Sequence, residues 1–315
     1  MSTRDDGLDP QAAALLDEFD TGIAPPSSTL SIETGRRLLD ELFAVADPEP
    51  VASCTDLGIQ GPNGPIPLRI YAPGTDAPAP VFVFMHGGGW VRGSLDAYDG
   101  LCRRLTNRTE AVVVSVDYRR APEHPFPAGF EDCYVATEWA AAHAGDLGGD
   151  PDRVAVGGDS AGGNLSAAVA LAARDRGGPD LAHQLLVYPA VNAPEIRWFD
   201  SYDTNGTGYF LETDSVEWYL DQYHRPADIG NHYVYPLRAR DLSGLPPATV
   251  LTAGYDPLLD EGKAYADRLE AAGVETTRLH YDDQIHAFLS LYTYLDAGRA
   301  AIDDVATQLA DALAE

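Results

Sequence analysis

Short apolar runs form the clearest pattern along the sequence. They are rich in Val, Leu, Phe and Ala and are bounded by Gly, Asp or Pro. Because they lack strict alternation of polar and apolar positions, they predict strands that are buried on both faces. The runs cover residues 80–85 (PVFVFM), 111–117 (AVVVSVD), 153–158 (RVAVGG), 183–189 (HQLLVYP) and 247–253 (PATVLTA).

Stretches with helical periodicity separate these runs. They cover residues 96–108, 128–144, 161–176, 260–272 and 298–314. Strands that alternate with helices indicate βαβ units and a mostly parallel sheet. A further strand is expected at 275–281, and residues 56–72 predict an antiparallel hairpin at the sheet edge, turning around Pro62, Asn63 and Gly64.

Two segments interrupt this alternation. Residues 1–50 contain two amphipathic stretches, and residues 191–240 are irregular and rich in aromatic side chains. We expect the first segment to form N-terminal cap helices and the second to be a cap insertion. The α/β core is then expected to comprise 51–190 and 241–315. A chain of 315 residues is long enough for one such domain with a lid.

The charge balance changes the list of possible partners. The formal net charge is -28, Lys263 is the only lysine, and 34 Asp outnumber 15 Glu. This negative field repels phosphates, so we expect neither nucleic-acid nor membrane-surface binding. The excess of carboxylates is typical of adaptation to high salt, whereas nucleotide bias is the alternative explanation for the preference for Arg over Lys.

Cysteine content and the N-terminal segment add two further expectations. Cys54, Cys102 and Cys133 are odd in number and widely spaced, which favours buried thiols over a disulfide framework or a zinc site. The first ten residues lack the pattern of a signal peptide, and no apolar run reaches the length of a membrane span. A cytoplasmic monomer or homodimer is therefore expected.

A G-x-S-x-G sequence carries the sharpest chemical signal. It spans 158–162 (GDSAG), between a predicted strand and a predicted helix. A serine nucleophile needs this tight turn, with glycines where side chains would clash. Upstream, 86–90 (HGGGW) directly follows the strand 80–85, at the place of an oxyanion loop. Its N–H groups and that of Ala161 could hold a tetrahedral oxyanion.

A serine nucleophile also requires an acid and a base that follow it in the chain. Asp256 comes just after the strand 247–253, whereas its competitor Asp260 opens a helix and is explained by an N-cap role. Only His280 and His286 follow Asp256; we favour His286, on a loop, over His280, inside a strand. His86 is expected to shape the glycine loop rather than to move protons.

These motifs resemble those of the hormone-sensitive-lipase-like family of α/β-hydrolase carboxylesterases, in which HGGGW, GDSAGG, a DPL segment and a terminal HGF occur in this order. The likeness includes residues 118–127 (YRRAPEHPFP). It implies an eight-stranded, mostly parallel α/β sheet with a helical cap, a Ser160, Asp256 and His286 triad, and oxyanion donors at Gly88, Gly89 and Ala161. The chain departs from the family at Ala287, where glycine is usual.

The resemblance and the residues together predict a serine carboxylesterase for esters of short to medium acyl chains, acting through an acyl-enzyme without metal or cofactor. Trp90, Tyr209 and Phe210 are our candidates for substrate contact, although most aromatics of such a cap only pack helices. Amidase or deacetylase activity on a specific small molecule remains open. So does a catalytically idle receptor for small molecules on the same fold.

Overall fold

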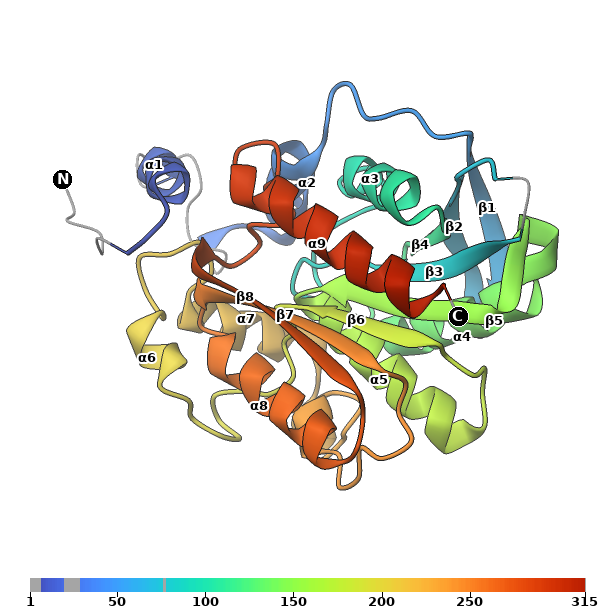
Figure 1. Ribbon diagram of the computed structural model, residues 1–315. Coiled ribbons are helices and arrows are strands. Elements are labelled where there is room, and N and C mark those ends of the chain that lie inside the picture. Colours follow the sequence, from blue (N-terminus) through green and yellow to red (C-terminus); the bar gives the residue numbers. More distant parts are fainter. Residues whose placement is uncertain (1–6, 20–28, 76–77, 315) are drawn as a thin grey trace.

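An eight-stranded sheet organises the computed structural model, which describes residues 7–19, 29–75 and 78–314 (Figure 1). The strand order is β1-β2-β4-β3-β5-β6-β7-β8. The strands are β1 (Ser53–Gly61), β2 (Gly64–Ala72), β3 (Ala79–Met85), β4 (Val112–Val116), β5 (Gly149–Asp159), β6 (His183–Val187), β7 (Ala248–Tyr255) and β8 (Thr276–Ile285).

Strand direction follows the sequence pattern. β1 and β2 pair antiparallel with Gly61 opposite Gly64, and β2 also pairs antiparallel with β4. All other pairs, from β4 through β3 and β5 to β8, are parallel. The predicted edge hairpin and the mostly parallel α/β sheet are therefore confirmed.

Helices cover both faces of this sheet. In Figure 1, α3 and α9 lie above the sheet, and α4, α5 and α8 lie below it. The helices of the described chain are α1 (Pro10–Glu18), α2 (Ile32–Phe43), α3 (Asp99–Thr109), α4 (Ala128–Ala142), α5 (Ala161–Arg176), α6 (Ser201–Thr204), α7 (Thr213–Tyr223), α8 (Leu259–Ala271) and α9 (Asp296–Ala312).

The central strands feed two separate cores because neighbouring side chains point to opposite faces. On β3, Val81, Val83 and Met85 belong to the cluster that contains α4, α5 and α8 residues. Phe82 and Phe84 belong to the cluster that contains α3 and α9 residues. This is why the run at 80–85 is apolar at every position after Pro80 and shows no alternation.

Strand β8 extends further than the sequence indicated. It ends at Ile285, whereas the pattern predicted its end at Tyr281. The added residues include Asp282 and Asp283, whose polarity hides the strand because β8 is an edge strand that is exposed at every second position. Gly254 permits the extension, since a Cβ there would lie 1.9 Å from the carbonyl oxygen of Asp282.

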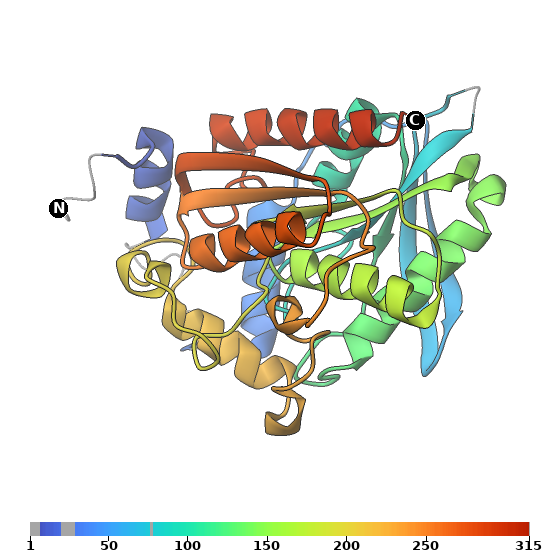
Figure 2. The same ribbon diagram turned by 60° about the horizontal axis from the view of Figure 1, so that its bottom comes forward.

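The two segments outside the alternation occupy different places. Helix α2 and helix α7 both contribute to the wall of one pocket, described below. Helix α1 contributes no residue to that pocket and packs Leu15 and Leu16 into the core shared with α9. Figure 2 shows α6 and α7 at one end of the sheet, away from the β1–β2 hairpin.

Candidate active site

Ser160 lies in a strained turn between β5 and α5. Its backbone has φ 57° and ψ -117°, a conformation that L-residues adopt only when the surroundings enforce it. Two glycines make the turn possible. A Cβ on Gly158 would lie 2.1 Å from the carbonyl oxygen of Met85, and one on Gly162 would lie 1.8 Å from the same atom. The predicted turn and its glycines thus have the geometry that the motif requires.

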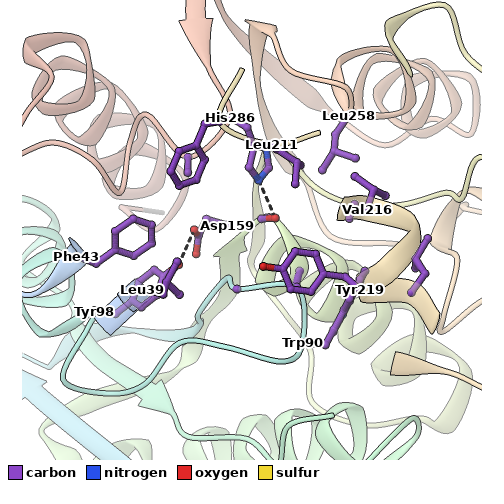
Figure 3. A pocket seen from close by; sticks show the side chains of 18 of the residues that line it. Leu39, Phe43, Trp90, Tyr98, Asp159, Leu211, Val216, Tyr219, Leu258 and His286 are labelled. Atoms are coloured by element: carbon purple, nitrogen blue, oxygen red, sulfur yellow. Dashed lines mark hydrogen bonds between the residues drawn. The ribbon is translucent and has the colours of Figure 1, made fainter. Parts of the chain in front are cut away.

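Three side chains predicted from sequence form one hydrogen-bonded line. The Nε2 atom of His286 lies 2.9 Å from Oγ of Ser160, and its Nδ1 atom lies 2.7 Å from Oδ2 of Asp256. Asp256 is fully buried, and its Oδ1 accepts a hydrogen bond from the N–H of Leu258 at 2.8 Å. In Figure 3 the imidazole of His286 points into the pocket, and a dashed line marks its hydrogen bond to Ser160.

The competing residues lie elsewhere. Asp260 accepts a hydrogen bond from the N–H of Ser201, so its carboxylate faces the insertion rather than a histidine. It is not the N-cap that we expected, because α8 begins at Leu259 and Leu258 precedes it. His280 lies on β8 with Nδ1 3.0 Å from the hydroxyl of Thr252.

His86 is buried beneath the glycine loop. Its ring stacks on Tyr118 at 4.4 Å and on Tyr98 at 5.5 Å, and its Nδ1 lies 2.8 Å from the carbonyl oxygen of Gly87. Burial lowers the pKa of His86 to about 3, so the ring stays neutral near pH 7. A neutral, stacked imidazole fits the expected role of shaping the loop.

The three backbone N–H groups that are expected to be oxyanion donors have no hydrogen-bond partner in the described part of the chain. They belong to Gly88, Gly89 and Ala161, and each of these residues lines the pocket. Gly88 has φ 111° and Gly89 has φ 61°, in the region that favours glycine. Ala161 is the first residue of α5, where an N–H has no acceptor within its own helix.

The pattern of residues gave no role to Asp159, although it lies inside the motif. This carboxylate is buried and accepts hydrogen bonds from the N–H of Gly87, from Tyr98 and from Ser290, at 2.8, 2.9 and 3.1 Å. Burial raises the pKa of Asp159, and the three donors oppose that shift. Asp159 therefore joins the turn at Ser160 to the glycine loop and to the segment after His286.

Two residues adjoin His286, and sequence analysis had singled out only the second of them. The ring of Tyr188 packs against the imidazole with centroids 4.7 Å apart. Ala287, at the position where the resembling family usually has glycine, has φ 65° and lines the pocket. The substitution therefore leaves an alanine in the left-handed region directly beside the imidazole.

A pocket with mostly apolar walls surrounds the serine. It encloses about 650 Å³ of space, part of which is open to solvent. Trp90 and Phe210 line it as expected, but Tyr209 does not, because its ring packs against Tyr255. Helix α2 and the 191–240 segment supply the wall residues Leu39, Phe43, Phe210, Leu211, Val216, Tyr219 and Leu220.

Two features of other functional classes are not found in the described residues. No group of three or more His, Cys, Asp or Glu side chains in 7–19, 29–75 and 78–314 is arranged to hold a metal ion. Over the same ranges, every helix is too short or too polar to cross a bilayer.

Comparison with known proteins shows which family the chain resembles. A family of proteins with the alpha/beta hydrolase fold matches residues 82–290. The carboxylic ester hydrolase LipN of Mycobacterium tuberculosis is 45% identical, over 82% of this chain and 70% of LipN. The carboxylesterase NlhH of the same organism is 39% identical, over 93% of this chain and 92% of NlhH.

Solved structures give the same result. An ester hydrolase from the metagenome of Lake Arreo, in complex with a bipyridine phosphonate derivative, superimposes with a TM-score of 0.93 and 41% identity, covering 98% of this chain and all of the other. The chain therefore belongs to the hormone-sensitive-lipase-like family of α/β hydrolases. The resemblance inferred from the motifs is confirmed.

A further buried carboxylate follows Asp256 along the chain. Glu261 on α8 accepts hydrogen bonds from the N–H groups of Val191 and Asn192 at 2.7 and 3.1 Å, and from the hydroxyl of Tyr202. Burial raises the pKa of Glu261 to about 7, and these donors oppose the rise. Its charge state therefore changes close to neutral pH.

This pKa predicts how stability depends on pH. Between about pH 4.5 and 7 the unfolded chain releases the Glu261 proton while the folded chain keeps it, so stability falls as pH rises. Glutamine cannot ionise. From pH 5 to 8 the unfolding free energy of the wild type should fall by about 2–3 kcal/mol relative to Glu261→Gln, measured by urea denaturation. The exposed Glu275→Gln serves as control. For each variant, the difference in unfolding free energy from the wild type is followed against pH. If this difference is independent of pH for Glu261→Gln, as it should be for Glu275→Gln, the assignment is contradicted.

Proposed function

We propose that this carboxylic ester hydrolase is a serine carboxylesterase that uses Ser160 as nucleophile, His286 as general base and acid, and Asp256 as the orienting carboxylate. Its substrates are small esters with short to medium acyl chains. The observation that carries the proposal is the hydrogen-bonded line from Asp256 through His286 to Ser160. Ser160 and His286 line the same apolar pocket as Gly88, Gly89 and Ala161, whose N–H groups have no partner in the described part of the chain.

The reaction follows from the chemistry of these groups. His286 accepts the Ser160 proton through Nε2, and the serine oxygen attacks the ester carbonyl carbon. Asp256 stabilises the imidazolium and fixes its tautomer through Nδ1. The imidazolium then protonates the leaving alcohol. Water, deprotonated by the same imidazole, attacks the acyl-enzyme and releases the carboxylic acid.

The oxyanion of each tetrahedral intermediate is assigned to the N–H groups of Gly88, Gly89 and Ala161. One such donor is worth about 2.7–4 kcal/mol of transition-state stabilisation. Support comes from the left-handed backbone of both glycines and from the position of Ala161 at the N-terminus of a 16-residue helix. The positive end of the helix dipole adds to the field at this point.

The roles of serine and acid can be tested by paired substitutions. Ser160→Ala should lower kcat for p-nitrophenyl acetate by at least about 10³-fold, because no other activated nucleophile is present in the line. Asp256→Asn should cost far more activity than Asp260→Asn, since only Asp256 contacts His286. Circular dichroism and melting curves control for folding. A reversed order of the two asparagine variants would refute the choice of Asp256.

The acyl-chain range is proposed from the walls of the pocket. Trp90 closes one side, stacked on Tyr223 with centroids 4.4 Å apart and hydrogen-bonded to Asn164 at 3.3 Å. Tyr219 packs against Gly89, where a Cβ would lie 2.3 Å from its ring. Walls held by stacked rings limit the length of chain that can enter.

Turnover should therefore depend on chain length. With p-nitrophenyl esters below their solubility limits, kcat/KM should be highest for acyl chains of roughly two to eight carbons and should fall for longer chains. Emulsified long-chain triglyceride is the control substrate. A preference for it over the soluble short esters would contradict the proposed range.

Salt adaptation is proposed from the charge balance alone. At a formal charge of -28 with one lysine, repulsion among carboxylates opposes folding in dilute buffer. The Debye length falls from about 10 Å at 0.1 M to about 3 Å at 1 M salt, so added salt screens this repulsion. The cytoplasmic location, the absence of nucleic-acid partners and the monomeric or homodimeric state stay predictions.

Melting temperature and activity should rise with salt. Raising KCl from about 0.1 to 2 M should increase the melting midpoint, measured by differential scanning fluorimetry, and should maintain or increase turnover. Sucrose, which strengthens burial without screening charge, serves as the control. If the melting midpoint is unchanged or falls between these salt concentrations, salt adaptation is contradicted and nucleotide bias explains the composition. The proposed catalytic roles would not be affected.

A further inference from the structure

The short helix α6 of the insertion lies against the segment that carries Asp256. The side-chain amide of Asn205, which follows α6 directly, donates to two carbonyl oxygens of this segment. Its Nδ2 atom lies 2.9 Å from the oxygen of Gly254 and 3.1 Å from that of Asp256. Asn205 is only 8% exposed, so these hydrogen bonds are largely shielded from water.

Ser201, at the start of α6, makes a second set of contacts with the same segment. Its hydroxyl donates to the carbonyl oxygen of Pro257 at 2.7 Å, and its N–H donates to Oδ2 of Asp260 at 3.0 Å. The N–H of Asp260 in turn donates to the Ser201 hydroxyl at 3.3 Å. Five hydrogen bonds thus join residues 254–260 to Ser201 of α6 and to Asn205, which follows it.

The pocket wall is tied to the same helix. Thr213, the first residue of α7, donates its hydroxyl to the carbonyl oxygen of Tyr202 at 2.7 Å and its N–H to that of Gly206 at 3.0 Å. Helix α7 then supplies Val216 and Tyr219 to the wall. One chain of hydrogen bonds therefore runs from the wall through α6 to the acid.

We propose that Asn205 is a positioning residue that holds the backbone of Asp256, so that its carboxylate meets His286 and the pocket wall is coupled to the catalytic line. The inference rests on the proposed function, because it assumes that Asp256 orients His286. It adds a role for the insertion in catalysis itself, beyond forming the wall of the pocket.

The need for such a residue follows from the geometry of Asp256. Its carboxylate makes two hydrogen bonds, one to the N–H of Leu258 and one to Nδ1 of His286. Both depend on where the backbone at 254–258 lies, just after β7 ends at Tyr255. A bulge interrupts the β7–β8 pairing between Ala253 and Tyr255, so the sheet alone does not fix this backbone. The amide of Asn205 bonds to it on either side of Tyr255.

The test compares substitutions at two neighbouring positions. Asn205→Leu keeps the size of the side chain but removes the donor, and Asn205→Ser is a milder variant that cannot span both carbonyl oxygens. Thr204→Ala is the matched control, because Thr204 is exposed and its hydroxyl donates to the carbonyl oxygen of Asp200 within the same turn. Wild type and Ser160→Ala are measured first in the same ester assay.

Two readouts separate positioning from simple structural support. We expect kcat to fall about 10- to 100-fold in both Asn205 variants, with KM changed by less than about threefold, because misplaced catalytic groups lower the rate of chemistry rather than binding. The downfield proton resonance of the His286 Nδ1–H, held by Asp256, should shift or broaden. Thr204→Ala should leave both unchanged.

Two outcomes would overturn the inference. One is a kcat within about twofold of Thr204→Ala in both Asn205 variants, even if their melting midpoints fall. The other is a lower kcat with an unshifted Nδ1–H resonance, since the loss would then not pass through Asp256. If Asn205→Leu does not fold, the kcat and the Nδ1–H resonance of Asn205→Ser test the inference. A wild type without Ser160-dependent hydrolysis would instead refute the proposed function.

Discussion

Close backbone contact at the end of β5 is the constraint on which the site depends. Gly158 and Gly162 touch the carbonyl group of Met85, the last residue of β3, at distances that no side chain would permit. This contact forces Ser160 into a backbone conformation that costs on the order of 1–3 kcal/mol. The hydrogen bond from the N–H of Ser160 to the carbonyl oxygen of Val187 and the deep burial of α5 offset that cost. Because β3 and β5 are neighbours, the same contact brings the glycine loop to the serine.

Buried carboxylates hold the segments around the site together through hydrogen bonds. Asp159 joins the nucleophile turn to the glycine loop and to Ser290, Asp256 meets His286 and Leu258, and Glu261 holds the start of the insertion. Each accepts hydrogen bonds from backbone N–H groups, hydroxyls or the imidazole, which a buried carboxylate requires. Removing one donor leaves a costly group inside the protein, so these contacts specify one arrangement of the loops.

The insertion contacts both the pocket and the segment that carries Asp256. Its α7 forms part of the pocket wall, while its α6 is bonded to the segment of Asp256. Both helices lie at the same end of the sheet in Figure 2. In a parallel sheet this is the edge where successive loops meet, so a segment inserted between β6 and β7 can contact the acid and the pocket together.

The sequence by itself determined the order of strands and helices, the nucleophile turn and the identity of the acid and base candidates. These rest on local signals: apolar runs of strand length, glycines around a serine, and the position of Asp256 and His286 after successive strands. The full length of β8 was missed because an exposed edge strand carries polar residues. Helix α8 begins at Leu259, so Asp260 is not its N-cap and instead accepts a hydrogen bond from Ser201, which no local pattern indicates.

Only the tertiary structure decided which side chains meet across the sheet. Asp159 and Asn205 gave no signal, because their partners lie far from them in the chain, as Gly87 does from Asp159 and Gly254 from Asn205. The aromatic residues of the insertion were indistinguishable in sequence, yet Phe210 lines the pocket and Tyr209 packs outside it. Local patterns reflect the backbone conformation and burial of a segment, whereas hydrogen-bond partners and pocket walls depend on distances that arise only when the layers pack together.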